Sequence, residues 1–306
     1  MKVLVTGGAG FIGTNLTLNL LSRGYEVKVF DDLSTGLKAN IPKDADFVNA
    51  SILEANQIDK AIKDCEVVVH LAARGSVPRS IKDPIATHNV NSTGTLNVLE
   101  AARNSQCHYI FSSSSSVYGS NMSLPKNEDM VLRPITPYAA SKMSGEALSL
   151  GYAKSYGLAV STFRFFNIFG PWQRPDHEYA AVLPKWISKC IKGDEIEIFG
   201  DGEQTRDFTY VGTVVSIIKN CISDKVCHPE PVNLAYGNDI SLNQVIYLLK
   251  DSFPDLKVKY LSPRGGDVLH SKNDPKLVKS LYPNVIIEKF EASLQETINW
   301  FKKSKI

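Results

Sequence analysis

The chain has 306 residues, 43% of them apolar, which is enough to bury one large core or two smaller cores that share an interface. Its formal net charge is only +2, from 34 basic and 32 acidic residues, so the charge balance gives no reason to expect binding to nucleic acid or to an anionic membrane. No segment reaches the roughly 18 apolar residues of a membrane span.

The N-terminal segment and the cysteines indicate the cellular compartment of the protein. The first apolar run breaks into glycines at Gly7, before it reaches the length of a signal peptide. The five cysteines are odd in number and lack metal-type spacing, which suits a reducing compartment. The histidines are scattered without a pair at i, i+4. We therefore expect a cytoplasmic protein without a metal site.

Short β-branched runs alternate with amphipathic stretches through the first two thirds of the chain. We predict strands at 3–6, 26–30, 47–49, 67–71, 109–112 and 160–164. This alternation is typical of a parallel sheet that helices cover on both faces. After Gly170, prolines and a turn at 200–202 interrupt shorter elements. We therefore predict a first domain at 1–170 and a smaller lobe at 171–306, with some segments of the lobe returning to the first domain.

A glycine-rich loop follows the first predicted strand directly. Gly7, Gly10 and Gly13 would let the backbone approach a pyrophosphate, whose charge is met by the N-terminus of the next helix. A tight strand-to-helix turn alone could also use these glycines. About 20 residues further on, the second strand ends in Asp31 and Asp32, where a carboxylate accepts hydrogen bonds from an adenosine ribose. An acid there repels a 2′-phosphate, so the sequence predicts NAD rather than NADP.

Tyr138 and Lys142 are four residues apart at the start of a predicted helix, so both side chains lie on one helix face. A phenol with a pKa near 10 is a poor base, but a nearby ammonium and the positive charge of a nicotinamide both favour the phenolate. Many ordinary helices contain such a pair. The preceding strand, however, ends in five serines at 112–116, where apolar residues are expected. We predict that these hydroxyls face the same cleft.

Six motifs together resemble those of the extended short-chain dehydrogenase/reductases that act on nucleotide sugars. They are GGAGFIG at 7–13, HLAA at 70–73, SSSSSVYG at 112–119, YAASK at 138–142, RFFNIFG at 164–170 and RGGD at 264–267. The resemblance covers essentially the whole chain. It implies an α/β fold, with a Rossmann-type doubly wound parallel sheet that binds NAD and a smaller C-terminal α/β lobe that binds a UDP-sugar. It also implies a homodimer.

The resemblance assigns roles to individual residues. A tyrosine placed like Tyr138 is the catalytic base, a lysine like Lys142 holds the nicotinamide ribose, and Ser114 bridges the sugar 4-hydroxyl and the tyrosine. The cofactor residues it implies are Gly7, Gly10, Phe11, Ile12, Gly13, Asp31, Asp32, Ser34, Thr35, Gly36, Ser51, Ile52, Leu71, Ala72, Ala73, Asn89, Ser112, Tyr138, Lys142 and Phe166. The substrate residues it implies are Ser76, Val77, Ser114, Ser115, Ser116, Asn167, Val182, Leu183, Phe199, Arg206, Arg264, Asp267 and Ser271.

Two serines favour one reaction within this family. Related 4,6-dehydratases carry an Asp-Glu pair directly after the catalytic hydroxyl residue, and UDP-glucuronate decarboxylases carry a glutamate before Val-Tyr-Gly. Here these places are Ser115 and Ser116, which cannot replace the extra acid and base. The sequence therefore predicts 4-epimerisation by transient oxidation at C4. UDP-glucuronate 4-epimerase and 4,6-dehydratase remain as alternatives. A dinucleotide-sensing regulator also remains, although such a protein would be expected to lose Tyr138, Lys142 or Ser114.

Further residues bear on the choice of substrate. Arg206 and Arg264 resemble the family's diphosphate-binding arginines, which grip phosphate oxygens with a planar fork, although either could be an ordinary surface residue. Asp267 is placed to take a ribose hydroxyl. Ser271 stands where some UDP-galactose epimerases have a tyrosine, and a small residue leaves room for a 2-acetamido group. Arg174, in a Gly-Pro-Trp-x-Arg-Pro-Asp motif similar to that of UDP-glucuronate 4-epimerases, could contact a carboxylate, but we favour a loop-capping role.

Ser51 departs from the family pattern. The family usually has an acid at this place, ahead of the isoleucine that follows the third strand, and that acid contacts adenine. The serine weakens one expected contact to adenine and leaves the pyrophosphate and ribose sites intact.

Overall fold

The computed structural model describes residues 1–176, 180–228, 230–263 and 270–304. Its centre is a seven-stranded sheet with the order β11-β6-β5-β4-β1-β2-β3, in which all neighbours are parallel. The strands are β1 (Lys2–Thr6), β2 (Glu26–Phe30), β3 (Asp46–Val48), β4 (Val67–His70), β5 (His108–Ser114), β6 (Val160–Phe165) and β11 (Val232–Leu234).

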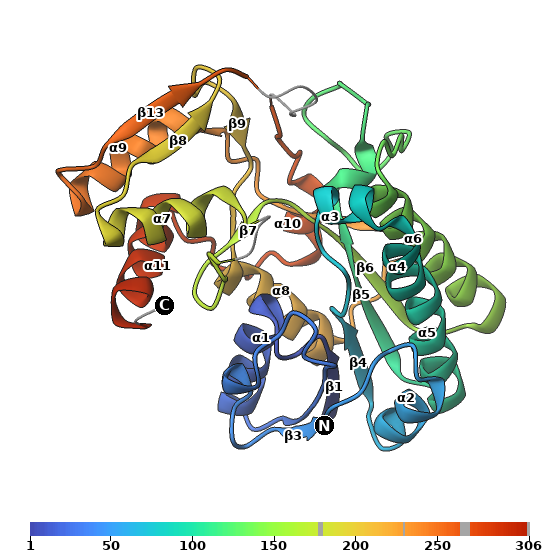
Figure 1. The fold of residues 1–306 in the computed structure, drawn as a ribbon. Coiled ribbons are helices and arrows are strands. Elements are labelled where there is room, and N and C mark those ends of the chain that lie inside the picture. Colours follow the sequence, from blue (N-terminus) through green and yellow to red (C-terminus); the bar gives the residue numbers. More distant parts are fainter. Residues whose placement is uncertain (177–179, 229, 264–269, 305–306) are drawn as a thin grey trace.

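Helices cover both faces of this sheet, with α1 and α8 on one face and α2, α5 and α6 on the other (Figure 1). The α-helices are α1 (Phe11–Ser22), α2 (Ala55–Ile62), α3 (Val77–Lys82), α4 (Pro84–His88), α5 (Gly94–Ser105), α6 (Pro137–Tyr156), α7 (Val182–Lys192), α8 (Val211–Asp224), α9 (Leu242–Ser252), α10 (Lys276–Leu281) and α11 (Phe290–Ser304). A π-helical turn, η2 (Asn89–Thr93), joins α4 to α5, and short 3₁₀ turns occur at η1 (Lys38–Asn40) and η3 (Ser115–Tyr118).

The sequence of β1 shows why the sheet is covered twice. Successive side chains of a strand point to opposite faces. Val3 and Val5 are buried in the core that includes α1 and α8, whereas Leu4 is buried in the core that includes α2 and α5. A strand buried on both faces must be apolar at nearly every position, which is typical of a parallel sheet. The predicted doubly wound parallel sheet is confirmed.

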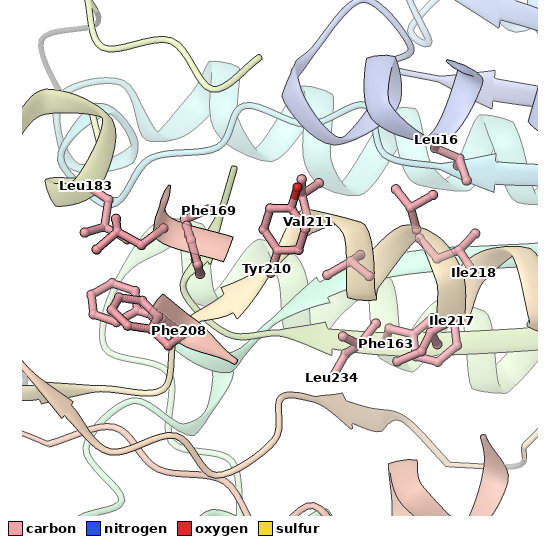
Figure 2. Close-up of a cluster of buried hydrophobic side chains, with 14 of the residues drawn as sticks. Leu16, Phe163, Phe169, Leu183, Phe208, Tyr210, Val211, Ile217, Ile218 and Leu234 are labelled. Atoms are coloured by element: carbon pink, nitrogen blue, oxygen red, sulfur yellow. The ribbon is translucent and has the colours of Figure 1, made fainter. Parts of the chain in front are cut away.

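The C-terminal lobe is built on short paired strands. They are β7 (Ile168–Phe169) with β10 (Thr209–Tyr210), β9 (Thr205–Arg206) with β12 (Ile240–Ser241), and β8 (Ile196–Phe199) with β13 (Val258–Leu261). Its apolar residues are continuous with the core on one face of the large sheet. Figure 2 shows Phe169, Phe208 and Tyr210 between Leu183 of α7 and the apolar side of α8. The lobe and the sheet therefore share one core.

The six predicted strands agree with the structure to within a residue or two at each end. The largest difference is β5, which continues through Ser114. The seventh strand, β11, and the helix α8 come from beyond residue 170, so the layer around the large sheet is not confined to the first 170 residues. No helix among the described residues has both the length and the apolar character that a membrane span requires.

Two buried histidines predict sensitivity to acid. The ring of His70 lies between Thr6 Oγ1, 2.7 Å from Nδ1, and Thr95 Oγ1, 3.0 Å from Nε2. Burial lowers the pKa of His70 to about 3 and that of His108 to about 4. The folded state therefore favours the neutral rings. Their contribution to stability is complete above about pH 6.5, the pKa of histidine in the unfolded chain, and it is lost as the pH falls below that value.

We expect the free energy of unfolding to fall by about 2 kcal/mol for each histidine when the pH is lowered from 6.5 to 5, because each histidine contributes about 1.4 kcal/mol per pH unit. Urea unfolding at pH 7 and pH 5 measures this loss. The His70→Asn variant should lose less stability between the two pH values than the wild type does. An equal loss in both proteins would contradict the assignment.

Candidate active site

Most of the predicted ligand residues meet in a cavity of about 620 Å³ at the carboxyl ends of β1, β2, β4 and β5. This edge is where open α/β sheets bind ligands. Residues 172–174, beyond β7, form another part of its wall. A second cavity, of about 300 Å³, lies in the C-terminal lobe, and Asn167, Ile168 and Ala181 line both. The two cavities are of the size of ligand sites and lie side by side, so a dinucleotide and a second ligand could meet at their junction.

The glycine loop forms a tight cradle at the end of β1. Gly7 has a φ of +71°, and a Cβ there would lie 2.7 Å from the backbone nitrogen of Ala72. A Cβ on Gly13 would lie 2.3 Å from the carbonyl oxygen of Gly7. A side chain at Gly7 would therefore clash with the backbone after β4, and a side chain at Gly13 would push α1 away from the loop. The N-terminus of α1 opens at the cavity, where it can meet a pyrophosphate.

Two carboxylates line the cavity at the end of β2. Asp31 is buried and accepts hydrogen bonds from the backbone nitrogens of Ala9, 3.0 Å from Oδ2, and Leu33, 2.8 Å from Oδ1. Burial raises its pKa, and the two backbone hydrogen bonds oppose this rise. Asp32 is exposed and accepts from the nitrogen of Ser34 at 2.9 Å. Asp31 thus ties β2 to the glycine loop, and both acids face the place expected for an adenosine ribose.

Tyr138 and Lys142 lie on the first turns of α6. The helix begins at Pro137, and Thr136 Oγ1 caps it by accepting from the nitrogen of Ala139 at 3.2 Å. The backbone nitrogen of Tyr138 donates to Ser80 Oγ at 3.0 Å, which fixes this end of α6 against α3. Lys142 Nζ donates to the carbonyl oxygen of Ser112 at 2.7 Å. The helix α6 and the strand β5 are therefore held together beside Tyr138 and Lys142.

Burial disfavours the charged form of both Tyr138 and Lys142 and shifts the pKa of each group accordingly. It raises the pKa of Tyr138, and a hydrogen bond with Ser114 acts in the opposite direction. It lowers the pKa of Lys142 to about 8, against the attraction of the Glu146 carboxylate. Ser114 is therefore a neighbour that favours the phenolate. The expected tuning of Tyr138 by the Lys142 charge remains a prediction.

A buried ion pair lies one helical turn beyond Lys142. Arg164 of β6 donates from Nε to Glu146 Oε1 at 3.0 Å and from Nη2 to Oε2 at 2.9 Å, and Ser113 Oγ donates to Oε1 at 2.5 Å. Both charged side chains are about 5% exposed or less. The sequence analysis did not identify this pair, although Glu146 follows Lys142 by four residues and so lies on the same helix face.

The smaller cavity gathers the residues predicted to bind a substrate nucleotide. They are Asn167, Val182, Leu183, Phe199 and Arg206. Asn167 lines both cavities, and its Nδ2 lies 3.5 Å from Ser271 Oγ. Arg264 and Asp267 lie outside the described residues.

The larger cavity contains most of the other predicted residues. They are Gly7, Gly10, Phe11, Ile12, Gly13, Asp31, Asp32, Ser34, Thr35, Ser51, Ile52, Leu71, Ala72, Ala73, Ser76, Ser112, Ser114, Tyr138, Lys142 and Asn167. Some predicted residues line neither cavity, namely Gly36, Val77, Asn89, Ser115, Ser116, Phe166 and Ser271. Ser116 still reaches the site indirectly, because its hydroxyl donates to Ser114 Oγ at 2.9 Å. The binding roles themselves remain predictions.

Two of these residues have side chains that do not face the larger cavity. Asn89 is exposed, and its neighbour Val90 lines the cavity instead. The side chain of Phe166 is fully buried against Val117 and Tyr118, whereas Phe165 faces the cavity. Any contact of Phe166 with a cofactor would therefore have to come from its main chain.

The sequence analysis also left out several residues that line the larger cavity. They include Arg74, Arg79, Phe165, Trp172 and Gln173. Spacing could have indicated Arg79, because it follows Ser76, the cap of α3, by three residues and so shares its side of the helix. Trp172 and Gln173 lie on an irregular segment for which periodicity gives no signal.

The cradle, the acids at the end of β2 and the Tyr–Lys pair belong to a dinucleotide-dependent enzyme of the extended short-chain dehydrogenase/reductase class. More narrowly, the chain belongs to the NAD dependent epimerase/dehydratase family, whose model matches residues 3–235. The predicted family and the predicted cofactor, NAD, are confirmed. A bound NAD fits the cavity, because the glycine loop and the N-terminus of α1 line it and the acids of β2 can take ribose hydroxyls.

The chain is similar over its full length to several known proteins. It is 36% identical over 306 residues to a putative UDP-glucose 4-epimerase of Methanocaldococcus jannaschii, covering 99% of both chains. It is 34% identical to a UDP-N-acetyl-alpha-D-glucosaminuronate decarboxylase of Bacillus cytotoxicus, covering 99% of this chain and 98% of the relative. A solved structure of UDP-N-acetylglucosamine 4-epimerase from Methanobrevibacter ruminantium, in complex with UDP-N-acetylmuramic acid, matches with a TM-score of 0.93 and 36% identity, covering 100% and 99%.

Proposed function

We propose that the chain is a UDP-hexose 4-epimerase that interconverts UDP-glucose and UDP-galactose and also accepts the corresponding N-acetylhexosamines. The similar epimerases of the two methanogens support this proposal. The similar decarboxylase shows that overall likeness does not select the reaction, so the choice depends on the side chains at the site.

The observation that carries the proposal is the absence of a carboxylate beside Ser114. Among the described residues that line the larger cavity, the acids are Asp31 and Asp32, and both stand at the end of β2. Next to Ser114, Ser115 and Ser116 occupy the places where related dehydratases and decarboxylases carry acids, and the Ser116 hydroxyl bonds to Ser114. Elimination of water needs an additional acid and base, whereas epimerisation needs only one group that removes and returns a proton.

In the proposed reaction, Tyr138 removes the proton of the sugar 4-hydroxyl and later returns it. Bound NAD would supply the acceptor for a hydride from C4 and the donor that returns it to the opposite face of the sugar. Ser114 holds the 4-hydroxyl and the tyrosine together by hydrogen bonds, and Lys142 holds the nicotinamide ribose. The helix cap and the Lys142–Ser112 hydrogen bond fix these groups before the substrate arrives. The sugar must rotate between the two steps. The nucleotide must therefore anchor the substrate outside the place where the sugar reacts.

The smaller cavity supplies such an anchor in this proposal. Val182, Leu183 and Phe199 offer apolar contact to a base, and Arg206 offers a cation for a diphosphate. Asn167 lies between this cavity and the catalytic end of the larger one. A nucleotide bound there would place its sugar at the junction, beside Ser271.

The strongest alternative substrate is UDP-glucuronate, because Arg174 stands in a motif similar to that of UDP-glucuronate 4-epimerases. In the structure its guanidinium contacts Asp176 and the carbonyl oxygen of Thr35, at the end of the cavity lined by the acids of β2. This position favours the loop role over recognition of a sugar carboxylate. A dinucleotide-sensing regulator is disfavoured because Tyr138, Lys142 and Ser114 lie in one cavity.

Incubation of the purified protein with UDP-glucose, UDP-N-acetylglucosamine and UDP-glucuronate separately, without added cofactor, tests the proposal. Chromatography should resolve a 4-epimer of unchanged mass from the first two substrates, which would also show that the protein retains NAD. A product that has lost carbon dioxide or water would support the decarboxylase or dehydratase instead. If no substrate reacts even with added NAD, other nucleotides and the regulator must be considered.

The Ser271→Tyr substitution tests the choice of sugar. Ser271 Oγ lies 3.5 Å from Asn167 Nδ2, so a tyrosine ring there would fill space at the junction of the cavities. We expect kcat/KM for UDP-N-acetylglucosamine to fall roughly tenfold or more relative to UDP-glucose, because a steric clash of this kind is worth about 1–3 kcal/mol. The ratio of the two kcat/KM values is the measurement. An unchanged ratio would show that Ser271 does not control access.

We also propose that the protein is a cytoplasmic homodimer. Ala140, Met143, Ala147 and Gly151 form an exposed row along α6, and Leu96 is partly exposed on the neighbouring α5. Small and apolar residues at this spacing allow two helices to pack closely. The cysteines are free thiols, which suits a reducing compartment. Light scattering of the purified protein tests the dimer, since it gives the mass directly.

A further inference from the structure

A segment of the C-terminal lobe, residues 170–176, forms part of the wall of the larger cavity. We call it the strap. It leaves β7 at Gly170, and three of its residues, Trp172, Gln173 and Arg174, line the cavity. At its start, Asn15 of α1 donates from Nδ2 to the carbonyl oxygen of Pro171 at 2.9 Å. The strap is therefore joined to the helix that begins at the glycine loop.

Arg174 makes a second connection, to the loop after β2. Its Nη1 donates to the carbonyl oxygen of Thr35 at 3.2 Å. Asp176 orients the guanidinium by accepting from Nε at 2.9 Å and from Nη2 at 2.5 Å. Thr35 follows the two acids of β2, at the end of the cavity that suits the adenosine ribose. Arg174 thus links the two sides of the cavity where that half of a dinucleotide would lie.

The other two residues of the strap that line the cavity are Trp172 and Gln173. Gln173 donates from Nε2 to the carbonyl oxygen of Ile168 at 3.1 Å, which fixes its amide. Its Oε1 is buried and has no hydrogen-bond partner among the described residues. A buried acceptor of this kind is costly unless a ligand or water satisfies it. Trp172 packs on Trp300 of α11, with ring centroids 5.3 Å apart, and so fixes the strap to the lobe.

We propose that the strap retains NAD in its cavity between turnovers, and that Arg174 is the residue that holds the strap closed. The adenosine half of NAD can leave only after the hydrogen bond to Thr35 is broken, while Gln173 Oε1 supplies an acceptor for the bound cofactor. A closed strap suits a reaction that returns its hydride in every cycle, because such an enzyme does not exchange its cofactor. The inference requires only that NAD binds in this cavity, so its failure would leave the proposed sugar and reaction untouched.

The test is the rate at which the NAD-loaded protein releases its cofactor. Samples are diluted into buffer with a scavenging excess of an NAD analogue, filtered at intervals, and assayed for bound NAD after denaturation. We expect Arg174→Gln to release NAD roughly tenfold faster or more, since a hydrogen bond to a charged group is worth about 1.5–3 kcal/mol and about 1.4 kcal/mol is tenfold. Asp176→Asn, which keeps the arginine but loses its orienting charge, should show a smaller acceleration.

The matched control is Arg23→Gln, on an exposed arginine at the end of α1 that bonds to Asn19 and lines neither cavity. It should release NAD at the wild-type rate. Release of NAD by Arg174→Gln at the wild-type rate would overturn the proposal. If that variant instead kept its NAD but showed a raised KM for the sugar nucleotide, Arg174 would belong to the substrate site. Should Arg174→Gln fail to fold, Asp176→Asn decides, and wild-type release from it would overturn the proposal.

Discussion

The Tyr138→Phe variant is expected to lose roughly 10²–10⁴-fold in kcat with UDP-glucose, the range that general acid–base catalysis contributes. Phenylalanine keeps the ring and its packing at the start of α6 but cannot remove or return a proton. No other described tyrosine lines the larger cavity, so no second phenol is in place to act as the base. Chromatography of UDP-galactose formed over time gives kcat directly.

A second tyrosine of the same helix provides the control. Tyr152 bonds to Glu100 of α5 and lines neither cavity, so Tyr152→Phe removes a hydroxyl from α6 without touching the site. This variant should turn over at close to the wild-type rate. Near-normal turnover by Tyr138→Phe would show that another group is the base, and Ser114 would then be the next candidate because of its hydrogen bond with Tyr138.

The sequence predicted those parts of the fold and site whose signals are local. Apolar runs predicted the strands of the large sheet because each is buried on both faces. The extent of β5 could not be read this way, because its last residues are serines. In the structure, Ser112 Oγ donates to the carbonyl oxygen of His70 at 2.9 Å and Ser113 bonds to Glu146, so these polar side chains are satisfied inside the protein. Their partners are 33 or more residues away in the sequence.

Local geometry explains why the side chains of Asn89 and Phe166 do not face the larger cavity. Asn89 is the first residue of the π-helical turn between α4 and α5, and such a turn inserts one residue relative to the α-helical pattern. The side chains that face the cavity therefore do not follow a regular helical spacing at this point. Phe166 follows the last residue of β6, where the alternation of the strand ends. The contacts of Arg174 with Thr35 and of Arg164 with Glu146 depend on tertiary structure and left no pattern in the sequence.

The Arg164→Met variant is expected to lose about 3–5 kcal/mol of unfolding free energy, the cost of leaving one member of a buried ion pair without its partner. Arg164 and Glu146 are both buried and joined by two hydrogen bonds, at 3.0 and 2.9 Å. Methionine keeps much of the length of the arginine but none of its charge, so the Glu146 carboxylate would remain in the interior with only Ser113 as a hydrogen-bond donor. Urea unfolding of the two proteins measures the difference.

An exposed pair of the same kind provides the comparison. Arg103 and Glu100 are three residues apart on α5, partly open to solvent, with Nη2 and Oε2 2.8 Å apart. Arg103→Met should cost less than about 1 kcal/mol, since water and salt screen a surface ion pair. The double variant Glu146→Gln, Arg164→Met should recover part of the loss, because it removes the buried charge as well as its partner. Equal losses of unfolding free energy in Arg164→Met and Arg103→Met would mean that burial does not determine how much the Arg164–Glu146 pair contributes to stability.

The same substitution should also weaken substrate binding, because the polar contacts of Arg164 continue toward the C-terminal lobe. Arg164 Nη1 donates to Tyr118 OH at 2.9 Å, and that hydroxyl donates to Asn233 Oδ1 at 2.7 Å. Asn233 Nδ2 then bonds to Asn273 Oδ1 at 2.8 Å, and the nitrogen of Asn273 donates to Asp207 Oδ2 at 2.9 Å. Asp207 adjoins Arg206 of the smaller cavity. Loss of Arg164 frees one end of this series of hydrogen bonds. KM for UDP-glucose should therefore rise in Arg164→Met and stay unchanged in Arg103→Met.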